Sequence, residues 1–146
     1  MELLRDPQID PAPLAGKTVA VIGYGNQGRA QALNLADSGI AVVVGLRDRS
    51  ASFARVEADG LAALSLSDAA AEANVVMLLA PDETLTSLYA EIEPRLRPGV
   101  ALGFAHGLAI RFDLIEPRAD LDVFMVAPKG SRIEAFIALQ PHQRLA

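Results

Sequence analysis

Three glycines spaced as GxGxxG follow a short apolar run near the start of the chain. The run, Val19–Ile22, has the length of a buried strand, and the glycines are Gly23, Gly25 and Gly28. A helical pattern rich in alanine and leucine follows over about residues 29–37. In such a context the glycines permit a tight turn, a close approach of the backbone to a pyrophosphate and close helix–strand packing. The motif predicts a dinucleotide site at the helix start, where amides and the helix dipole attract an anion.

The residues after a second apolar run (41–46) bear on which dinucleotide is bound. An acid at this point hydrogen-bonds the ribose 2′-OH of NAD, whereas an arginine accommodates the 2′-phosphate of NADP. Arg47 offers a planar fork for a phosphate, and the hydroxyls of Ser50 and Ser52 add donors. Asp48 would repel a phosphate if it faced the ribose, which favours NAD. A solvated turn with a serine cap is the structural alternative, and we favour NADP(H) over NAD(H).

The rest of the chain alternates between apolar runs and helical patterns. Strands are predicted at 18–22, 41–46, 63–66, 75–79, 101–105 and 123–126, and helices at 29–37, 50–58, 68–73 and 84–96, with a helical turn near 112–115. Residues 1–15, with three prolines, read as an extended lead-in, and 133–139 fit either a strand or a helix. This alternation predicts an α/β fold, a Rossmann-type doubly wound parallel sheet, in a single domain over residues 16–146.

Composition narrows the class of protein. The 146 residues are 51% hydrophobic with a formal net charge of −5, and no basic stripe or aromatic ladder suggests a nucleic-acid partner. There is no cysteine, which fits a reducing cytoplasm. The start of the sequence lacks the apolar core of a signal peptide, and no apolar run approaches the roughly 20 residues that span a bilayer. We therefore expect a cytoplasmic domain with neither a nucleic-acid nor a membrane partner.

Several strings in the chain together resemble the N-terminal domain of ketol-acid reductoisomerase. The resemblance covers roughly residues 14–130, in the same order and at the same spacing. The strings are GYGNQG (23–28), QALNL (31–35), DSG (37–39), VVVGLR (42–47), PDET (81–84), IEP (92–94), FAHG (104–107) and MVAPKG (125–130). This resemblance implies a Rossmann domain that binds NADP(H). In the family, the enzyme uses magnesium to migrate an alkyl group in an acetohydroxy acid and then reduces the product, in branched-chain amino-acid synthesis.

The resemblance also implies roles for individual residues of the cofactor site. The pyrophosphate contacts would come from Tyr24, Gly25, Asn26 and Gln27. The 2′-phosphate would be held by Arg47, Ser50 and Ser52, which agrees with the interpretation above. The cofactor cleft would be lined by Asp82, Glu83 and Thr84. For these last three, simple capping of the helix by Asp82 is an equal alternative.

Two further residues match the family's reaction site. His106 matches an active-site histidine, and Lys129 matches a lysine near the metal and the substrate. A histidine at the carboxyl end of a strand could relay a proton, and a lysine could stabilise developing oxyanion charge. A hydrogen-bonded loop residue is the structural alternative for His106.

The sequence departs from the family in three places. Asn26 stands where serine is usual, and Asp48 where a basic or neutral residue is usual. After Lys129 and Gly130 the family's Pro-Gly-His segment is replaced by SRIE (131–134). The family's C-terminal helical domain, with its acidic metal ligands, has no counterpart in the 146 residues. We therefore expect magnesium only if that domain is supplied, and no complete catalysis by this truncated chain alone.

Three hypotheses remain after these departures. The first is the cofactor-binding half of a ketol-acid reductoisomerase. The second is a nucleotide-binding or oligomerisation module without catalysis, and the third is a small reductase of other specificity that uses His106 or Lys129 as an acid. Helical surface that the absent domain would cover predicts a homo-oligomer or a partner chain.

Overall fold

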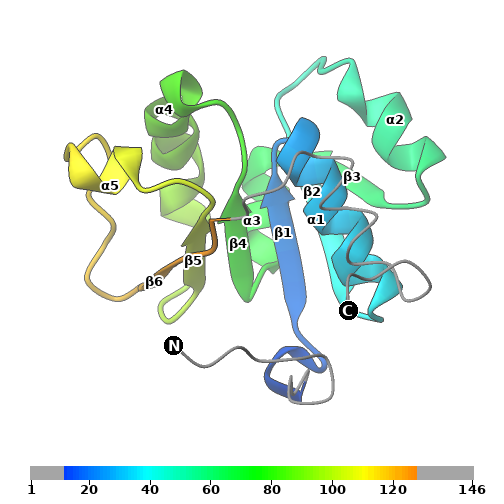
Figure 1. Cartoon of the computed structure of the whole chain (residues 1–146), viewed down its shortest axis with the longest axis horizontal. Helices are drawn as coiled ribbons and strands as arrows, with labels where there is room; N and C mark the ends of the chain where they lie inside the picture. Colours follow the sequence, from blue (N-terminus) through cyan, green and yellow to red (C-terminus); the bar gives the residue numbers. More distant parts are fainter. Residues whose placement is uncertain (1–11, 128–146) are drawn as a thin grey trace.

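A single parallel sheet of six strands forms the centre of the computed structural model, which describes residues 12–127 (Figure 1). The strands are β1 (Thr18–Ile22), β2 (Ala41–Leu46), β3 (Ala62–Ser65), β4 (Val75–Leu78), β5 (Ala101–Phe104) and β6 (Asp122–Met125). Their order is β3-β2-β1-β4-β5-β6, and every neighbouring pair is parallel. The predicted doubly wound α/β fold is confirmed. The strand order reverses between β1 and β4, and ligands bind at such a switch point, outside the carboxyl ends of the strands.

Five α-helices and two short 3-10 helices connect the strands within the described residues. They are η2 (Ala12–Leu14), α1 (Asn26–Asp37), α2 (Ser52–Ala58), α3 (Leu66–Glu72), α4 (Asp82–Ile92), η3 (Glu93–Arg95) and α5 (Leu108–Arg111). Figure 1 shows α2 and β3 at one end of the sheet and α5 and β6 at the other.

Alternate residues of the strands enter two separate cores. Val19 and Val21 of β1 pack with residues of α1 and α2, whereas Ala20 and Ile22 pack with residues of α3 and α4. All four side chains are at most 2% exposed. Because both faces are covered, the central strands are continuously apolar rather than alternating, as is usual for a parallel sheet.

All four predicted helices have different limits in the structure. Helices α2 (Ser52–Ala58) and α3 (Leu66–Glu72) differ from the predicted 50–58 and 68–73 by one or two residues at an end, and α1 and α4 differ more. Helix α1 begins at Asn26, three residues before the predicted start, because Gly28 is accommodated inside its first turn. Helix α4 begins at Asp82 with Pro81 as its N-cap, and it ends at Ile92. A 3-10 turn follows it, with a proline at the start of the turn, so the single helix predicted over 84–96 is divided.

Two smaller predictions are corrected. The helical turn expected near 112–115 lies at Leu108–Arg111 instead, and the left-handed φ of 55° at Asp113 follows its end. The N-cap of α3 is Ser65, the last residue of β3, and the Ser65 side chain accepts a hydrogen bond from the Asp68 amide at 3.1 Å. Residues Ala12–Leu14 form a 3-10 turn within the predicted extended lead-in. The element predicted at 133–139 lies outside the described residues.

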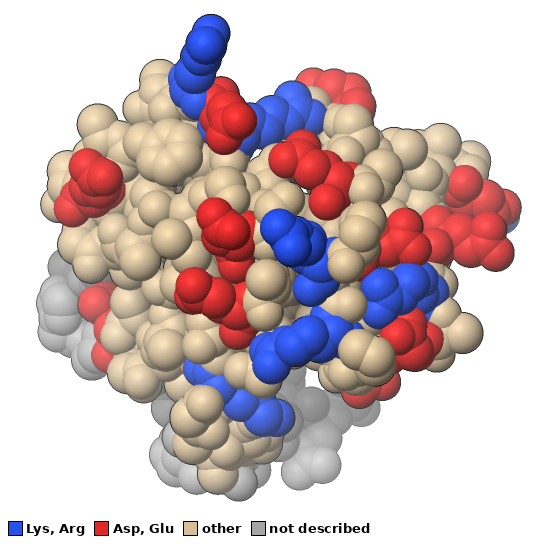
Figure 2. All heavy atoms as spheres, turned by 180° about the vertical axis from the view of Figure 1, so that it is seen from behind, with Lys and Arg blue, Asp and Glu red and all other residues tan. Residues whose placement is uncertain are grey.

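Charged side chains of both signs are interspersed on the surface seen in Figure 2. No single-sign field dominates that face. Across residues 12–127 no helix has the length and apolar character required to cross a membrane.

Candidate dinucleotide-binding site

The turn after β1 is built from three glycines with different tasks. Gly23 has a φ of 95°, a conformation that other residues rarely adopt, and its amide donates to the Gly45 carbonyl at 3.1 Å. A Cβ on Gly28 would overlap the carbonyl oxygen of Gly23. A Cβ on Gly25, by contrast, would meet nothing within 4 Å, and the φ there is −79°. The fold itself therefore needs no glycine at position 25, and the open space there is available to a ligand.

Gly25 is also the N-cap of α1, and no side chain caps this helix end. In any α-helix the amides of the first turn lack an acceptor within the helix. The end of the helix faces a cleft of about 370 Å³ at the switch point of the sheet. The cleft is lined by Gly25, Asn26, Gln27, Leu78, Leu79, Ala80, Pro81, Asp82, Leu85, Ala105 and His106. Segments that follow β1, β4 and β5 thus meet at the N-terminus of α1, where backbone N–H groups favour an anionic ligand.

A second cavity, of about 250 Å³, lies on the β2 side of the same turn. Its lining brings Arg47, Ser50 and Ser52 together with Thr84. The remaining lining residues are Gly23, Tyr24, Gly25, Gly45, Leu46, Leu66, Ala80, Pro81 and Leu88. Gly25 belongs to both hollows, so the two adjoin at the turn. Together they form an elongated site along the carboxyl ends of the strands.

A tight turn directs Ser50 back toward Arg47. The Ser50 amide donates to the Arg47 carbonyl at 3.1 Å, and Arg49 between them adopts a left-handed φ of 61°. The Ser50 hydroxyl oxygen in turn accepts from the Ser52 amide at 3.2 Å. This bond leaves the Ser50 hydroxyl proton available to donate to a ligand. The exposed Asp48 is not among the residues that line either hollow.

The Tyr24 hydroxyl belongs to a polar cluster that the sequence did not predict. Its hydroxyl donates to Asp59 at 2.8 Å, and Arg29 binds the same carboxylate through two nitrogens at 2.7 and 2.8 Å. The hydroxyl proton of Tyr24 is thus committed to Asp59 rather than to a ligand. The hydrogen bonds from Arg29 hold the pKa of Asp59 below its usual value, while burial, with the Asp59 contacts, raises the pKa of Tyr24. No spacing rule links residues 24, 29 and 59, so only the fold reveals them.

We expect Asp59→Asn to destabilise the fold by about 1–2 kcal/mol, because charged hydrogen bonds to a partly exposed arginine are lost. The pKa of Asp59 is lowered by folding, so its contribution is complete above the unfolded pKa of about 3.9 and is lost as pH falls through the folded value. Urea unfolding at pH 7 and pH 3 should show that the difference in free energy of unfolding between wild type and Asp59→Asn is smaller at pH 3. Asp48→Asn is the control and should leave the free energy of unfolding as in wild type at both pH values.

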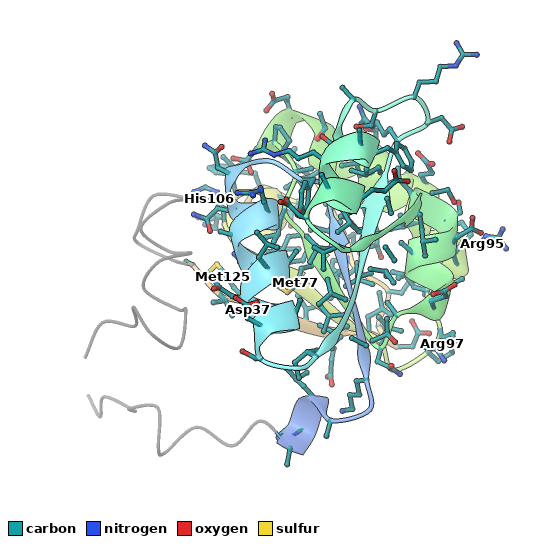
Figure 3. The ribbon with its side chains drawn as sticks, turned by 90° about the vertical axis from the view of Figure 1, so that its right-hand side faces the viewer. Asp37, Met77, Arg95, Arg97, His106 and Met125 are labelled. Atoms are coloured by element: carbon teal, nitrogen blue, oxygen red, sulfur yellow. The ribbon has the colours of Figure 1, made fainter. Side chains whose placement is uncertain are left out.

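His106 lies at the rim of the 370 Å³ cleft, two residues after the end of β5. Its side chain is 66% exposed, and its Nδ1 lies 3.8 Å from Asp82 Oδ2 and accepts from the Leu108 amide at 3.3 Å. The imidazole is thus oriented by the start of α5 and by Asp82 at the edge of the cleft. Figure 3 shows His106 and Met125 on the same side of the molecule, opposite Arg95 and Arg97.

The other predicted site residues divide between the cleft and the surface around it. Asp82 and Thr84 line the hollows, and Thr84 donates its hydroxyl to the Pro81 carbonyl at 2.8 Å. Asp82 does not cap α4, since the N-cap is Pro81. Glu83 is exposed in the first turn of α4 and lines neither hollow. Lys129 lies outside the described residues. Among residues 12–127 no three acidic or histidine side chains are grouped to hold a metal ion.

A parallel sheet of this order, with a glycine turn at its switch point and two adjoining hollows, defines a nucleotide-binding domain of the Rossmann type. Comparison with known proteins specifies the family. The family described as acetohydroxy acid isomeroreductase, NADPH-binding domain, matches residues 13–134. The chain belongs to this family.

Individual relatives agree with that assignment. A ketol-acid reductoisomerase (NADP(+)) of Beutenbergia cavernae is 55% identical over 130 residues. The structure of an NADH-preferring ketol-acid reductoisomerase from an uncultured archaeon superposes with a TM-score of 0.90 at 43% identity over 95% of this chain. A semialdehyde dehydrogenase NAD-binding protein from Cupriavidus necator, solved with calcium and NAD, gives 0.68 at 27% identity over 77% of the chain.

The similarity covers only part of each relative. The match with the Beutenbergia protein covers 88% of this chain but 38% of that protein, and the two structural matches cover 44% of the archaeal chain and 41% of the Cupriavidus chain. The likeness therefore concerns the dinucleotide-binding domain of these proteins.

Proposed function

We propose that this chain binds NADP(H), in preference to NAD(H), as the cofactor-binding part of a ketol-acid reductoisomerase. The observation that carries the preference is the convergence of Arg47, Ser50 and Ser52 on one cavity beside the glycine turn. A guanidinium fork and two hydroxyls match the acceptor oxygens of a phosphate monoester. The carboxylate of Asp48 lies outside that lining and does not offset these donors there.

The dinucleotide would lie along the carboxyl ends of the strands with its pyrophosphate at the start of α1. The open space at Gly25 and the uncapped helix end support this placement. The adenosine end would occupy the 250 Å³ cavity next to Arg47, and the nicotinamide end the 370 Å³ cleft next to His106.

We further propose that the whole protein isomerises and reduces an acetohydroxy acid. Bound NADPH supplies the hydride for the reduction. His106, with an exposed ring at the rim of the cleft, would hold or relay a proton there. Lys129 would stabilise oxyanion charge, and acids of a helical domain would hold magnesium. Turnover of acetolactate with magnesium separates this reaction from a non-catalytic nucleotide-binding module or a reductase of other specificity.

A preference for NAD(H) is the second candidate. Asp48 directly follows Arg47, and the archaeal relative at 43% identity is described as NADH-preferring. The two candidates differ in the sign of the affinity difference between NADPH and NADH.

Calorimetric titration with NADPH and NADH decides between the two candidates. We expect NADPH to bind wild type more tightly than NADH. Arg47→Ala should weaken NADPH binding by roughly 10- to 100-fold, the effect of one hydrogen bond to a charged group, and NADH binding much less. Arg55→Ala, which removes an exposed arginine of α2 outside both hollows, should leave both affinities unchanged. Tighter NADH binding by wild type would instead establish the second candidate.

We also propose that the chain self-associates or meets a partner through the region around α5 and β6. Phe112 and Met125 there are 65% and 58% exposed, and Leu114, Val123 and Val126 are also exposed. Apolar surface of this kind is typical of an interface. Light scattering at high concentration tests the proposal, and a strict monomer would contradict self-association.

A further inference from the structure

The guanidinium of Arg47 is hydrogen-bonded to helix α4, which lies across the 250 Å³ cavity from β2, the strand that Arg47 follows. Its Nη2 donates to the hydroxyl oxygen of Ser87 at 2.9 Å. Arg47 directly follows β2, whereas Ser87 lies 40 residues later in the chain, in the middle of α4. Thr84 and Leu88, on either side of Ser87 in this helix, line the same 250 Å³ cavity. The contact therefore joins the two elements that bound the proposed adenosine end.

The hydroxyl of Ser87 has a fixed direction. It donates its one proton to the Thr84 carbonyl at 2.9 Å, a bond to the preceding turn of the same helix. The oxygen can therefore only accept from Arg47, which suits a guanidinium that can only donate. The backbone of α4 thus determines where the lone pair for Arg47 lies.

The contact matters because Arg47 is exposed and its side chain is long. An unrestrained arginine loses rotamer entropy when it is fixed in one geometry. A guanidinium carries five N–H donors, and the bond to Ser87 uses one nitrogen and leaves the others for a ligand. Orienting the fork before the ligand arrives reduces the entropy lost on binding.

We propose that Ser87 is a positioning residue for dinucleotide specificity: it holds Arg47 across the cavity so that its remaining donors face the 2′-phosphate. The proposal rests on the proposed function, since it requires that phosphate at Arg47. Ser87 acts through Arg47 and lines neither hollow itself. Because NADH has no 2′-phosphate, the loss of Ser87 should affect NADPH far more than NADH.

Calorimetry on the whole chain with NADPH and NADH tests the proposal. Ser87→Ala should weaken NADPH binding by roughly 3- to 10-fold, the effect of one hydrogen bond, with NADH within about twofold and an unchanged thermal midpoint. Ser87→Asp should weaken NADPH more than Ser87→Ala, because the new carboxylate pairs with Arg47 and repels the phosphate. Thr86→Ala is the matched control, since the Thr86 hydroxyl donates to the Leu114 carbonyl at 3.2 Å instead. In an Arg47→Ala background, Ser87→Ala should have no further effect.

Equal losses for both dinucleotides would show a merely structural role for Ser87 and overturn the proposal. Unchanged NADPH affinity in Ser87→Ala, alongside a loss in Arg47→Ala, would overturn the proposal alone and leave the proposed function standing. If wild type bound neither dinucleotide, or if Arg47→Ala bound NADPH as wild type does, the proposed 2′-phosphate site would fail as well.

Discussion

Replacing Gly25 by valine is expected to weaken dinucleotide binding by roughly 100-fold or more while the chain stays folded. The new side chain would fill the space beside the N-terminus of α1, where a Cβ meets no protein atom within 4 Å. A pyrophosphate excluded from this space loses its charge-assisted bonds to the backbone, and about 3 kcal/mol of lost interaction corresponds to that factor. Calorimetry with NADPH measures the affinity, and urea unfolding measures the stability.

Gly25→Val should have little effect on the stability of the fold. Gly25 is exposed at the N-cap, with a φ of −79° that other residues adopt, so valine should cost about 1 kcal/mol at most. Gly25→Ser is the matched control: it restores a good N-cap and adds a smaller group, and it should lose less affinity. If Gly25→Val bound NADPH with wild-type affinity, the pyrophosphate would not lie at this turn.

Replacing Gly28 by alanine should affect mainly the stability of the fold, whereas Gly25→Val affects mainly dinucleotide binding. We expect Gly28→Ala to destabilise the fold by about 2 kcal/mol. The added Cβ would overlap the Gly23 carbonyl oxygen, and the carbonyl carbon lies only 3.0 Å away. Both neighbours are backbone atoms of a turn that cannot shift cheaply, so overpacking should cost about 3 kcal/mol. The better helix propensity of alanine offsets about 1 kcal/mol of that cost.

Urea unfolding measures this difference directly. Gln31→Ala, three residues later in the same helix and half-buried, is the control and should stay within about 0.5 kcal/mol of wild type. Wild-type stability in Gly28→Ala would show that α1 can move away from the turn without cost, and that this glycine is not required for close packing.

The fold could be predicted because local patterns and global topology agree. Apolar runs such as 19–22 and 75–79, separated by helical segments, leave few arrangements other than a parallel sheet with covered faces. The boundaries were less predictable, since they depend on tertiary contacts. Considered alone, Gly28 predicts a helix boundary. In the structure it lies inside α1, where the lack of a side chain makes room for the Gly23 carbonyl.

The site was predictable only where one motif supplies its residues. The GxGxxG spacing marks the turn, and Arg47, Ser50 and Ser52 follow the second strand closely enough to be found by position. The partners of these residues come from distant segments: Asp59 binds the Tyr24 hydroxyl, and Ser87 binds Arg47. No periodicity connects such pairs, because their contact depends on how β2, α2 and α4 pack in three dimensions.

The most direct test of the dinucleotide site is a crystal structure of the chain with NADPH bound. We predict that the pyrophosphate lies against Gly25 at the start of α1 and that the 2′-phosphate is within hydrogen-bond distance of Arg47, Ser50 and Ser52. A dinucleotide bound elsewhere, or a 2′-phosphate turned away from Arg47 into solvent, would contradict the placement proposed here.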